Sequence, residues 1–327
     1  MTEPIRWGIL GTGNIAHQFA RGLADTADAE LVAVGSRSIE TANTFGDEFS
    51  IPRRHASYDE LAADDGVDAV YVSTPHPFHK DNSILLLEHG KAVLCEKPFT
   101  INAGETKEVI DVARQRDIFL MEAMWTRYVP AVVRARELIA AGAIGDVRMV
   151  QADFGFRAGV NPEGRLFNPD LGGGALLDVG IYVTSLASMV LGPRPAEVVS
   201  TTQIGETGVD EQSAMLLKYP GGELAVLSCA VRTGTSVEAR IFGTEGSILL
   251  HSPFFKCDAL SVKRGGDEEH IDLPLEGNGY NYEAAEVGRC LRAGLKESDV
   301  MPLDETLALM ELLDSIRAQW GLTYPME

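Results

Sequence analysis

The first third of the sequence alternates between two kinds of segment. Short, largely apolar runs typical of strands lie at residues 5–10, 31–36, 68–74, 92–96 and 118–122. Segments with helical character lie between them, at 39–49, 78–89 and 102–115, and after the first run Ile15, Phe19 and Leu23 recur at helical spacing. Parallel strands need a crossover connection, which is usually a helix. The alternation therefore predicts an α/β domain with a doubly wound parallel sheet and helices on both faces.

The pattern changes after about residue 122. One helix is predicted at 130–141, and a second helical segment begins at Gly174. Turn signals at 219–223 and 243–246 separate several β-rich runs, as in antiparallel hairpins. We assign strands to residues 147–156, 196–204, 212–219, 223–231, 237–243 and 247–250, and closing helices to about 280–293 and 303–317. The sequence thus predicts two domains, residues 1–122 and 123–327, of which the second is an α+β domain with an antiparallel sheet.

The charge balance excludes two classes of partner. The 327 residues include 28 Lys and Arg against 48 Asp and Glu, which gives a formal net charge of −20. This charge repels a nucleic-acid backbone and an anionic bilayer alike. No run reaches the roughly 18 apolar residues that a membrane span needs. We therefore expect neither nucleic acid nor a membrane as partner.

The cysteines bear on the compartment and on metals. Cys95, Cys229, Cys257 and Cys290 are scattered and form no CxxC pair. This spacing suggests neither a zinc cluster nor a disulfide framework. The amino-terminal residues also lack the basic and apolar regions of a signal peptide. We expect a cytoplasmic protein in a reducing setting, with no metal site.

A glycine motif directly follows the first predicted strand and opens the first predicted helix. In residues 11–16, GTGNIA, Gly11 allows a tight turn and Gly13 lets the backbone approach a pyrophosphate. Ala16 permits close packing of helix on strand. This context predicts a dinucleotide-binding Rossmann domain over residues 1–122. The cofactor contacts expected here are Gly11, Thr12, Gly13, Asn14 and Ile15.

The end of the second strand bears on which dinucleotide binds. NAD-binding domains carry an acidic residue there that bonds the ribose hydroxyls. This chain instead has Ser36 and Arg37, and no acid. A hydroxyl beside a guanidinium suits the 2′-phosphate of NADP, because arginine supplies a fixed charge and paired donors. NADP is therefore favoured; if Arg37 is merely solvated, the protein accepts NAD as well.

Polar residues also follow the fourth and fifth strands, at the edge where open parallel sheets bind ligands. Glu96 and Lys97 end the fifth strand, and Pro98 disfavours an immediate turn into a helix. A lysine at a strand end serves equally well as a solvated cap or as a functional group. The fourth strand is followed by Thr74, His76 and His79. We include these residues among the candidate cofactor contacts, although His79 can equally begin a helix.

The order of four motifs resembles a known family. The strand with GTGNIA, then STPHPFH (73–79), CEKP (95–98) and GGGALLDVGIY (172–182), look like the Gfo/Idh/MocA oxidoreductases over nearly the whole chain. Within it, LMEAMWTRYVP (120–130), the HPFH run and the GIY ending resemble the branch of dimeric dihydrodiol dehydrogenases, also known as NADP-dependent D-xylose dehydrogenases. That branch has histidine at the position of His76, where several other members have asparagine.

This resemblance implies a fold and an activity. The fold is a Rossmann domain followed by a domain with an open, largely antiparallel sheet, whose exposed face commonly forms an oligomer interface; a homodimer through this sheet is expected. The activity is NAD(P)-dependent oxidation of a secondary alcohol on a sugar, polyol or cyclic diol, or reduction of the matching ketone. Lys97 matches the active-site lysine of the family.

The GGG segment is better read as part of the active site than as a nucleotide loop, because it follows no first-domain strand. Asp178 and Tyr182 lie one turn apart on a common face beside an apolar stripe, and Gly192 with Pro193 ends the helix. Its glycines are expected to let the helix approach the reactive end of the cofactor. We assign Tyr182 as acid/base and Asp178 as its orienting group. The alternative is that Asp178 only favours the helix dipole and that Tyr182 only packs at the core edge.

Many family members have histidine where this chain has Tyr182. Free tyrosine, with a pKa of about 10, is a poor base at neutral pH, but an adjacent ammonium favours the phenolate. We therefore assign Lys97 as the electrostatic activator of Tyr182 and as a donor to the substrate oxygen. Aromatic faces suit a sugar or cyclic diol, and arginine binds hydroxyls, although each candidate is equally explained by packing or a surface ion pair. The substrate candidates are Trp125, Arg127, Tyr128, Phe154, Phe156 and Arg157.

Two other functions fit the same sequence. One is a non-catalytic, NAD(P)-sensing regulator of the same fold, which has no need to keep Lys97 and Tyr182 together. The other is a ketosugar reductase of deoxysugar biosynthesis, which acts on nucleotide-linked sugars and needs a more open cleft.

Overall fold

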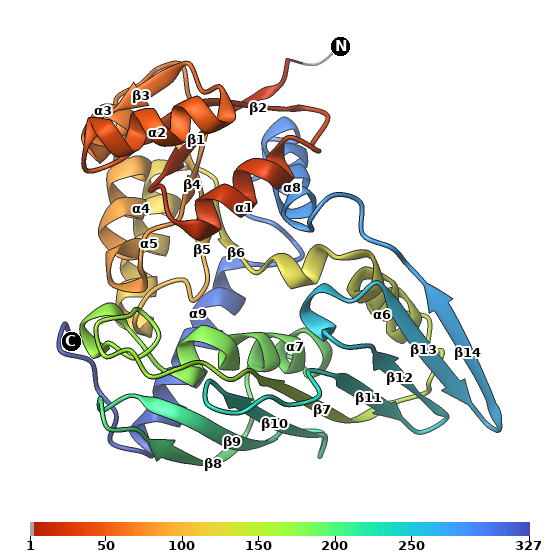
Figure 1. Ribbon diagram of the computed structural model, residues 1–327. Coiled ribbons are helices and arrows are strands. Elements are labelled where there is room, and N and C mark those ends of the chain that lie inside the picture. The colour runs from red at the N-terminus through yellow and green to blue at the C-terminus, as the bar shows by residue number, and fades with distance from the viewer. Residues whose placement is uncertain (1–2) are drawn as a thin grey trace. The chain divides into compact units, whose positions relative to one another are not determined.

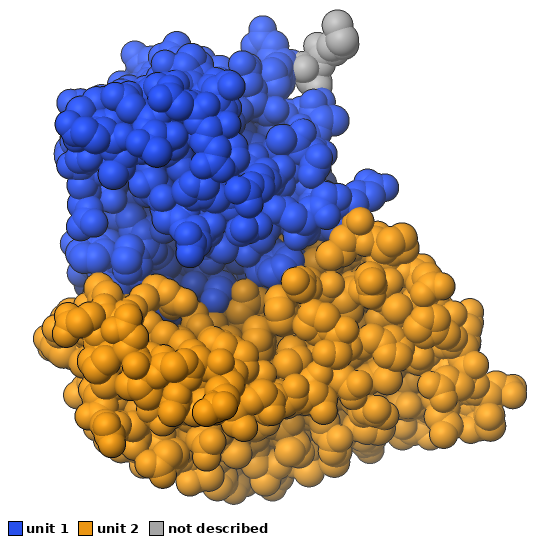
Figure 2. Space-filling view, viewed as in Figure 1, with its two compact units in different colours: residues 1–125, 276–307 blue, residues 126–275, 308–327 orange. Residues whose placement is uncertain are grey.

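The computed structural model describes residues 3–327 of the chain (Figure 1). The chain divides into two compact units, distinguished by colour in Figure 2. Unit 1 comprises residues 1–125 and 276–307, and unit 2 comprises 126–275 and 308–327. The observed division therefore differs from the predicted domains chiefly at 276–307, which the prediction assigned to the second domain. This segment returns to unit 1 because helix α8 (Tyr280–Arg292) packs on α1 (Asn14–Leu23), where a Cβ at Gly22 would lie 2.8 Å from that of Tyr280.

Unit 1 contains the predicted doubly wound sheet. All of its strand pairs are parallel, and the strand order is β3-β2-β1-β4-β5-β6. This is the order of a Rossmann sheet, in which ligands bind beyond the carboxyl ends of the strands where the order reverses. Here the reversal lies between β1 and β4. The strands span Ile5–Leu10 (β1), Ala29–Gly35 (β2), Arg53–His55 (β3), Ala69–Val72 (β4), Ala92–Glu96 (β5) and Leu120–Ala123 (β6).

The helices of unit 1 begin where capping side chains occur. Ser38, Ser57 and Asn102 each accept a hydrogen bond from a backbone N–H in the first turn of the following helix. Two short elements were not predicted: β3, because two of its three residues are arginines, and the five-residue helix α3. Besides α1 and α8 the helices are α2 (Ile39–Phe49), α3 (Tyr58–Ala62), α4 (His79–Glu88), α5 (Ala103–Arg116) and the first turns of α9 (Leu303–Ala318).

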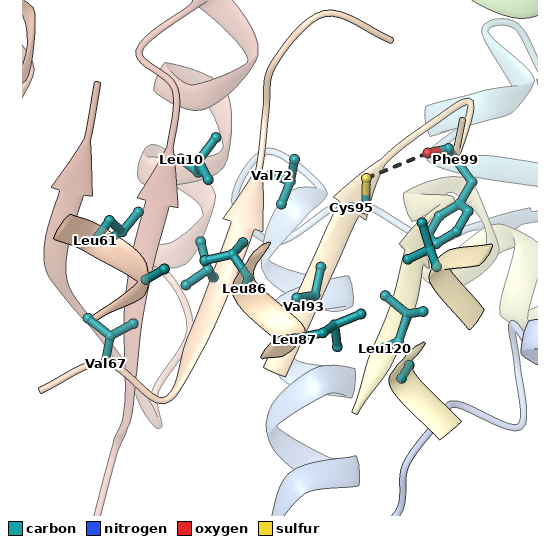
Figure 3. Close-up of a cluster of buried hydrophobic side chains, with 14 of the residues drawn as sticks. Leu10, Leu61, Val67, Val72, Leu86, Leu87, Val93, Cys95, Phe99 and Leu120 are labelled. Atoms are coloured by element: carbon teal, nitrogen blue, oxygen red, sulfur yellow. Dashed lines mark hydrogen bonds between the residues drawn. The ribbon is translucent and has the colours of Figure 1, made fainter. Parts of the chain in front are cut away.

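One face of this sheet forms a continuous apolar core (Figure 3). Leu10, Val72 and Val93 extend from three neighbouring strands, and Leu86 and Leu87 from α4 cover them. Cys95 lies in the same cluster, with its Sγ 3.7 Å from the carbonyl oxygen of Phe99. Burial raises the pKa of this thiol, so Cys95 belongs to the core as a neutral group.

Unit 2 contains a sheet of eight strands in the order β14-β13-β12-β11-β7-β10-β9-β8. Every pair is antiparallel except β7 with β10, which confirms the largely antiparallel second sheet. The two strands at one end, β13 and β14, were not predicted; the sequence of β14, DEEHID, lacks apolar alternation. The strands span Val147–Gly155 (β7), Glu197–Ile204 (β8), Asp210–Lys218 (β9), Leu224–Ala230 (β10), Ala239–Gly243 (β11), Gly246–Leu250 (β12), Ala259–Arg264 (β13) and Asp267–Asp272 (β14).

The two faces of this sheet differ in character. Helices α6 (Pro130–Ala140) and α7 (Ile181–Leu191) cover one face, as Figure 1 shows. Strand residues that face the helices, such as Leu217 and Ala225, are buried. Their neighbours along the strands point to the other face, as the period of two requires. That face exposes the apolar side chains Val199, Leu216 and Val226, with exposed fractions of 55%, 44% and 42%.

One helical stretch of the described residues, Pro169–Leu191, is long and apolar enough to cross a membrane. An 18-residue window within its 23 residues has a mean hydropathy of 1.7. However, 83% of its apolar window is buried inside the structure, which is typical of a core helix.

Candidate active site

The turn between β1 and α1 has the geometry of a phosphate-binding turn. Gly11 adopts φ +102°, and a Cβ there would lie 2.9 Å from Oγ of Ser73, at the end of β4. Only glycine fits both the left-handed backbone and this close approach. Gly13 is the N-cap residue of α1 and provides no side-chain cap, and the first turn of the helix has no acidic residue. A Cβ at Gly13 would meet no atom within 4 Å, so the helix N-terminus opens onto free space.

The end of β2 presents hydroxyls and a guanidinium. The Oγ of Ser36 lies 2.5 Å from Oγ1 of Thr41, and Ser38 caps α2. Arg37 is exposed. Burial raises the pKa of the Tyr58 phenol. The nearby charge of Arg37 lowers this pKa in part, which places Arg37 close to Tyr58. The strand end therefore carries a positive charge and no carboxylate, as the sequence predicts.

A buried histidine joins the segments that follow β4 and β5. One ring nitrogen of His79 lies 2.7 Å from the carbonyl oxygen of Thr74, and the other lies 3.0 Å from that of Pro98. Burial lowers the pKa of His79, and the nearby charge of Lys97 lowers it further. His79 thus holds together the two backbone segments that follow β4 and β5. His76, in the turn before α4, is also buried, with its ring 5.7 Å from that of His79.

A buried carboxylate accepts a hydrogen bond from the backbone of Lys97. The side chain of Glu96 accepts hydrogen bonds from the hydroxyl of Tyr71 and, at 3.1 Å, from the backbone N–H of Lys97. Lys97 is half-buried, and its peptide bond to Pro98 is cis. Glu283, on α8, is fully buried beside this group; burial and then the Glu96 charge raise its pKa, which favours the neutral acid.

In unit 2, Asp178 and Tyr182 lie on one continuous helical segment. A five-residue π-turn, Leu176–Gly180, carries Asp178 and runs directly into α7, whose second residue is Tyr182. Asp178 is 8% exposed and Tyr182 7%. An Nη of Arg165 lies 2.9 Å from Oδ1 of Asp178. No sequence pattern points to Arg165, because its contact depends on how the loop before the glycines folds.

Two phenylalanine rings lie beside Tyr182. The ring of Phe154, on β7, lies 5.3 Å from that of Tyr182, and Phe255 lies 5.6 Å from it. Phe154 and Phe255 stack on each other at 4.5 Å. The carbonyl oxygen of Phe255 accepts a hydrogen bond from Thr126. Phe255 was not predicted; the pattern of the sequence offers no signal for it, since it lies in a short turn between strands.

The remaining substrate candidates have other contacts in the structure. Trp125 belongs to unit 1 and stacks on Tyr280 at 4.7 Å. Arg127 is buried and donates to both the hydroxyl and the carbonyl oxygen of Ser185, on α7. Tyr128 is buried, whereas Phe156 is half-buried and Arg157 exposed; these last two lie just beyond the end of β7 rather than on the strand.

The predicted site residues thus form two groups, each within one unit. Those assigned to the cofactor, with Lys97, gather at the carboxyl ends of β1, β2, β4 and β5 in unit 1. Asp178, Tyr182 and Phe154 lie in unit 2, together with Arg165 and Phe255. The roles of all these residues remain predictions.

Comparison with known proteins gives two family matches. A model described as "Oxidoreductase family, NAD-binding Rossmann fold" matches residues 5–124, and one described as "GFO/IDH/MocA C-terminal domain" matches residues 132–249. Among curated relatives, the trans-1,2-dihydrobenzene-1,2-diol dehydrogenases of Mus musculus and Homo sapiens are each 39% identical, over 99% of both chains.

Two solved structures are similar over nearly their whole length. A 3-ketoreductase from Actinomadura kijaniata, in complex with NADP and TDP-benzene, is 26% identical with a TM-score of 0.86, over 97% of this chain and 98% of that one. An aldose-aldose oxidoreductase from Caulobacter crescentus, complexed with glycerol, is 25% identical with a TM-score of 0.88, over 98% of each chain.

Proposed function

The chain belongs to the Gfo/Idh/MocA family of NAD(P)-dependent oxidoreductases, and we propose that it transfers a hydride between NADP and a secondary alcohol or ketone of a sugar or cyclic diol. Tyr182 is the acid/base of this reaction. The observation that carries the proposal is the pairing of Asp178 with Arg165, one helical turn before Tyr182 and its two phenylalanine neighbours. The substrate class follows the dihydrodiol and sugar enzymes to which the chain is similar.

The residues of unit 1 fit a dinucleotide. The open space at Gly13 and the uncapped N-terminus of α1 suit a pyrophosphate, because backbone N–H groups and the helix dipole favour an anion there. Arg37 and Ser36 suit a 2′-phosphate. When bound, NADP(H) accepts or supplies the hydride. His79 keeps Thr74 and Pro98 in place beneath this site, so its ring acts on the backbone.

Proton transfer is assigned to a residue of unit 2. During oxidation the Oη of Tyr182 takes the proton of the substrate hydroxyl, and during reduction it returns that proton to the carbonyl oxygen. Asp178 orients this centre and is itself held by Arg165. Phe154 and Phe255 supply flat apolar surfaces for a sugar or diol ring. Lys97 supplies the positive charge that favours the phenolate form of Tyr182 and a donor to the substrate oxygen.

A spectrophotometric screen at 340 nm tests the function. NADP and NAD are each offered with aldoses, inositols, cyclic trans-diols and dicarbonyls. We expect turnover with NADP and a diol or sugar. Tight NADP binding without turnover of any substrate would favour the sensing regulator instead. Turnover restricted to nucleotide-linked ketosugars would favour the deoxysugar reductase, a role suggested by the similarity to the 3-ketoreductase.

Arg37 is expected to determine the preference for NADP. Arg37→Gln should raise the KM for NADP by about 10-fold or more, since a hydrogen bond to a charged group contributes about 1.5–3 kcal/mol. The KM for NAD should stay unchanged. Initial-rate kinetics with both cofactors measure the two values. The control is Arg134→Gln, an exposed arginine of α6 paired with Glu137. An equal change for NADP and NAD would contradict the assignment.

We also propose a homodimer through the uncovered face of the unit 2 sheet. Val199, Leu216 and Val226 form an exposed apolar row across β8, β9 and β10 on this face. Exposed apolar patches of this kind mark association surfaces. Beside the row lies a hollow of about 420 Å³, whose lining includes Thr201, Gln203, Gln212, Ala214 and Ser228. A partner sheet would cover both.

Charges placed in this row should separate the subunits. The double variant Leu216→Asp/Val226→Asp buries two carboxylates in the proposed interface, and we expect a dimer to become a monomer at micromolar concentration. Sedimentation velocity measures the mass in solution. Leu295→Asp, at an exposed apolar position of unit 1, is the control and should remain dimeric. A monomeric parent chain, or a double variant that stays dimeric, would contradict the interface.

A cytoplasmic location is the last element of the proposal. The cysteines Cys95, Cys229, Cys257 and Cys290 are free and buried, as suits a reducing compartment. Fractionation of the native host that recovered the chain from an oxidising compartment would contradict this location.

A further inference from the structure

A buried carboxylate holds the start of the segment that carries Asp178 and Tyr182. Asp210, the first residue of β9, is fully buried. Its Oδ2 accepts a hydrogen bond from the backbone N–H of Leu176 at 2.7 Å and lies 3.3 Å from Oγ of Ser213. The first N–H groups of a helix have no partner within the helix, and a negative charge there interacts favourably with the helix dipole. Asp210 therefore anchors the segment two residues before Asp178.

Gly174 makes room for this anchor, and Gly173 makes room for the preceding loop. Gly174 adopts φ +122°, and a Cβ there would overlap Oδ1 of Asp210. A Cβ at Gly173 would lie 2.8 Å from the carbonyl oxygen of Leu166 and 2.9 Å from that of Arg165. The chain thus approaches the carboxylate on one side and the loop that supplies Arg165 on the other. Both close approaches are to protein atoms.

The anchor carries a cost in stability. The Asp210 carboxylate is fully buried, and taking a charge out of water is unfavourable unless its hydrogen bonds compensate for the lost hydration. Burial raises the pKa of Asp210 to about 6, although hydrogen bonds from the N–H of Leu176, the Ser213 hydroxyl and the backbone N–H groups of Asp210 and Ala175 lower it. At pH 7 the folded chain therefore holds a charge that its surroundings disfavour. A residue that opposes stability in this way is expected where function requires it.

Other titratable groups lie near Asp210. The pKa values of Cys229, on β10, and of Tyr324 are both raised, chiefly by burial and then by the Asp210 charge. The hydroxyl of Tyr324 donates to the carbonyl oxygen of Gly173 at 2.8 Å. The remaining charges are paired with one another: Asp178 with Arg165, Glu211 with Arg232, and Arg317 with Asp314 and Glu327.

We propose that Asp210 is a positioning residue for the reaction, whose carboxylate fixes the start of the π-turn and thereby sets where the Asp178 carboxylate and the Tyr182 phenol lie. This inference rests on the proposed function of Tyr182. Asp210 acts through the backbone N–H of Leu176. Protonation turns a charge-assisted hydrogen bond into a weaker neutral one, so kcat should fall as the pH drops through about 6.

The variant Asp210→Asn separates positioning from stability. The amide keeps the shape and one acceptor oxygen but removes the charge. Because the folded pKa is raised, the contribution of Asp210 to stability is greatest below its unfolded pKa of 3.8 and is lost as the pH rises through about 6. At pH 7.5 Asp210→Asn should therefore unfold at the same or a higher temperature than the parent. Its kcat should nevertheless be lower by about 10-fold, because small displacements of reacting groups are costly.

Kinetics and amide exchange test the proposal together. We expect Asp210→Asn to lose the decline of kcat near pH 6, with an unchanged Kd for NADP. In the parent, amide hydrogen exchange at Leu176 and Asp178, relative to the intrinsic rate, should slow as the pH falls through about 6, because opening exposes a carboxylate whose pKa is lower outside the fold; in the variant this change should be absent. Glu297→Gln is the matched control, since Glu297 caps another helix by accepting from the N–H of Leu303 at 2.7 Å.

Each outcome decides a separate question. A parent-like kcat and pH profile in Asp210→Asn would overturn the positioning role. A lower kcat accompanied by a lower unfolding temperature at pH 7.5 would overturn it as well. If the parent turns over no substrate but the exchange at Leu176 still depends on Asp210, the proposed function fails and the anchor stands. Gly174→Ala gives a second route, because its Cβ displaces Asp210; it should lower kcat less in an Asp210→Ala background than in the parent.

Discussion

Tyr182→Phe is expected to lower kcat by about 10²- to 10⁴-fold, the range that a positioned proton donor or acceptor contributes. The substitution removes one oxygen and leaves the ring, so the contacts with Phe154 and Phe255 remain. The Kd for NADP should stay the same, because the residues assigned to the cofactor lie in unit 1. Stopped-flow measurement of the hydride-transfer step with deuterated substrate separates chemistry from product release.

The control for this experiment is Tyr282→Phe. Tyr282, on α8, also uses its hydroxyl in a hydrogen bond, which it accepts from the N–H of Glu276 at 2.8 Å, but it lies outside the assigned site. Its variant should keep kcat. If Tyr182→Phe retained a kcat within a few-fold of the parent, the acid/base role would pass to Lys97.

Lys97→Met should lower kcat by about 10²- to 10³-fold, which is the cost of removing one group that stabilises charge in the transition state. Methionine keeps most of the length of the side chain and removes the ammonium. The backbone N–H of Lys97, which donates to Glu96, is unaffected, so the fold and NADP binding should persist. Steady-state kinetics and fluorescence titration with NADPH measure the two effects.

A double variant tests whether Lys97 acts through Tyr182. Residues that act as one unit lose little more together than apart, so Lys97→Met/Tyr182→Phe should be about as slow as the slower single variant. Independent roles would give losses that multiply. Lys107→Met is the control, because Lys107 is exposed and pairs with Asp111 one turn along α5. Near-normal turnover by Lys97→Met would remove lysine from the mechanism.

The two halves of the candidate site differ in how far the sequence predicted them. The cofactor half followed from strand ends: a period of apolar residues locates each strand, and the rules of parallel sheets then bring Gly11, Arg37 and Lys97 to one edge. The strand order of unit 1 confirms this sheet. The catalytic half was predicted only in part. Helical spacing joined Asp178 to Tyr182 but gave no sign of Arg165, Phe255 or Asp210.

The GGG segment illustrates the difference. The sequence indicated that three glycines before a helix allow a close approach, and the expected neighbour was the cofactor. In the structure Gly174 lies against the Asp210 carboxylate and Gly173 against the carbonyl oxygens of the preceding loop. Gly173 and Gly174 therefore fit the helix against other parts of unit 2. Asp210 lies 34 residues from Leu176 along the chain, and nothing in the local pattern relates the two.

The sequence by itself determined the family, the parallel and antiparallel sheets, and the helix that carries Asp178 and Tyr182, because each depends on the period of nearby residues. The tertiary structure alone decided that 276–307 returns to unit 1, that Arg165 pairs with Asp178, and that Asp210 caps the helix. These contacts join segments that are far apart along the chain. They form only when folding brings a loop or strand end against a helix, and a local pattern carries no record of that encounter.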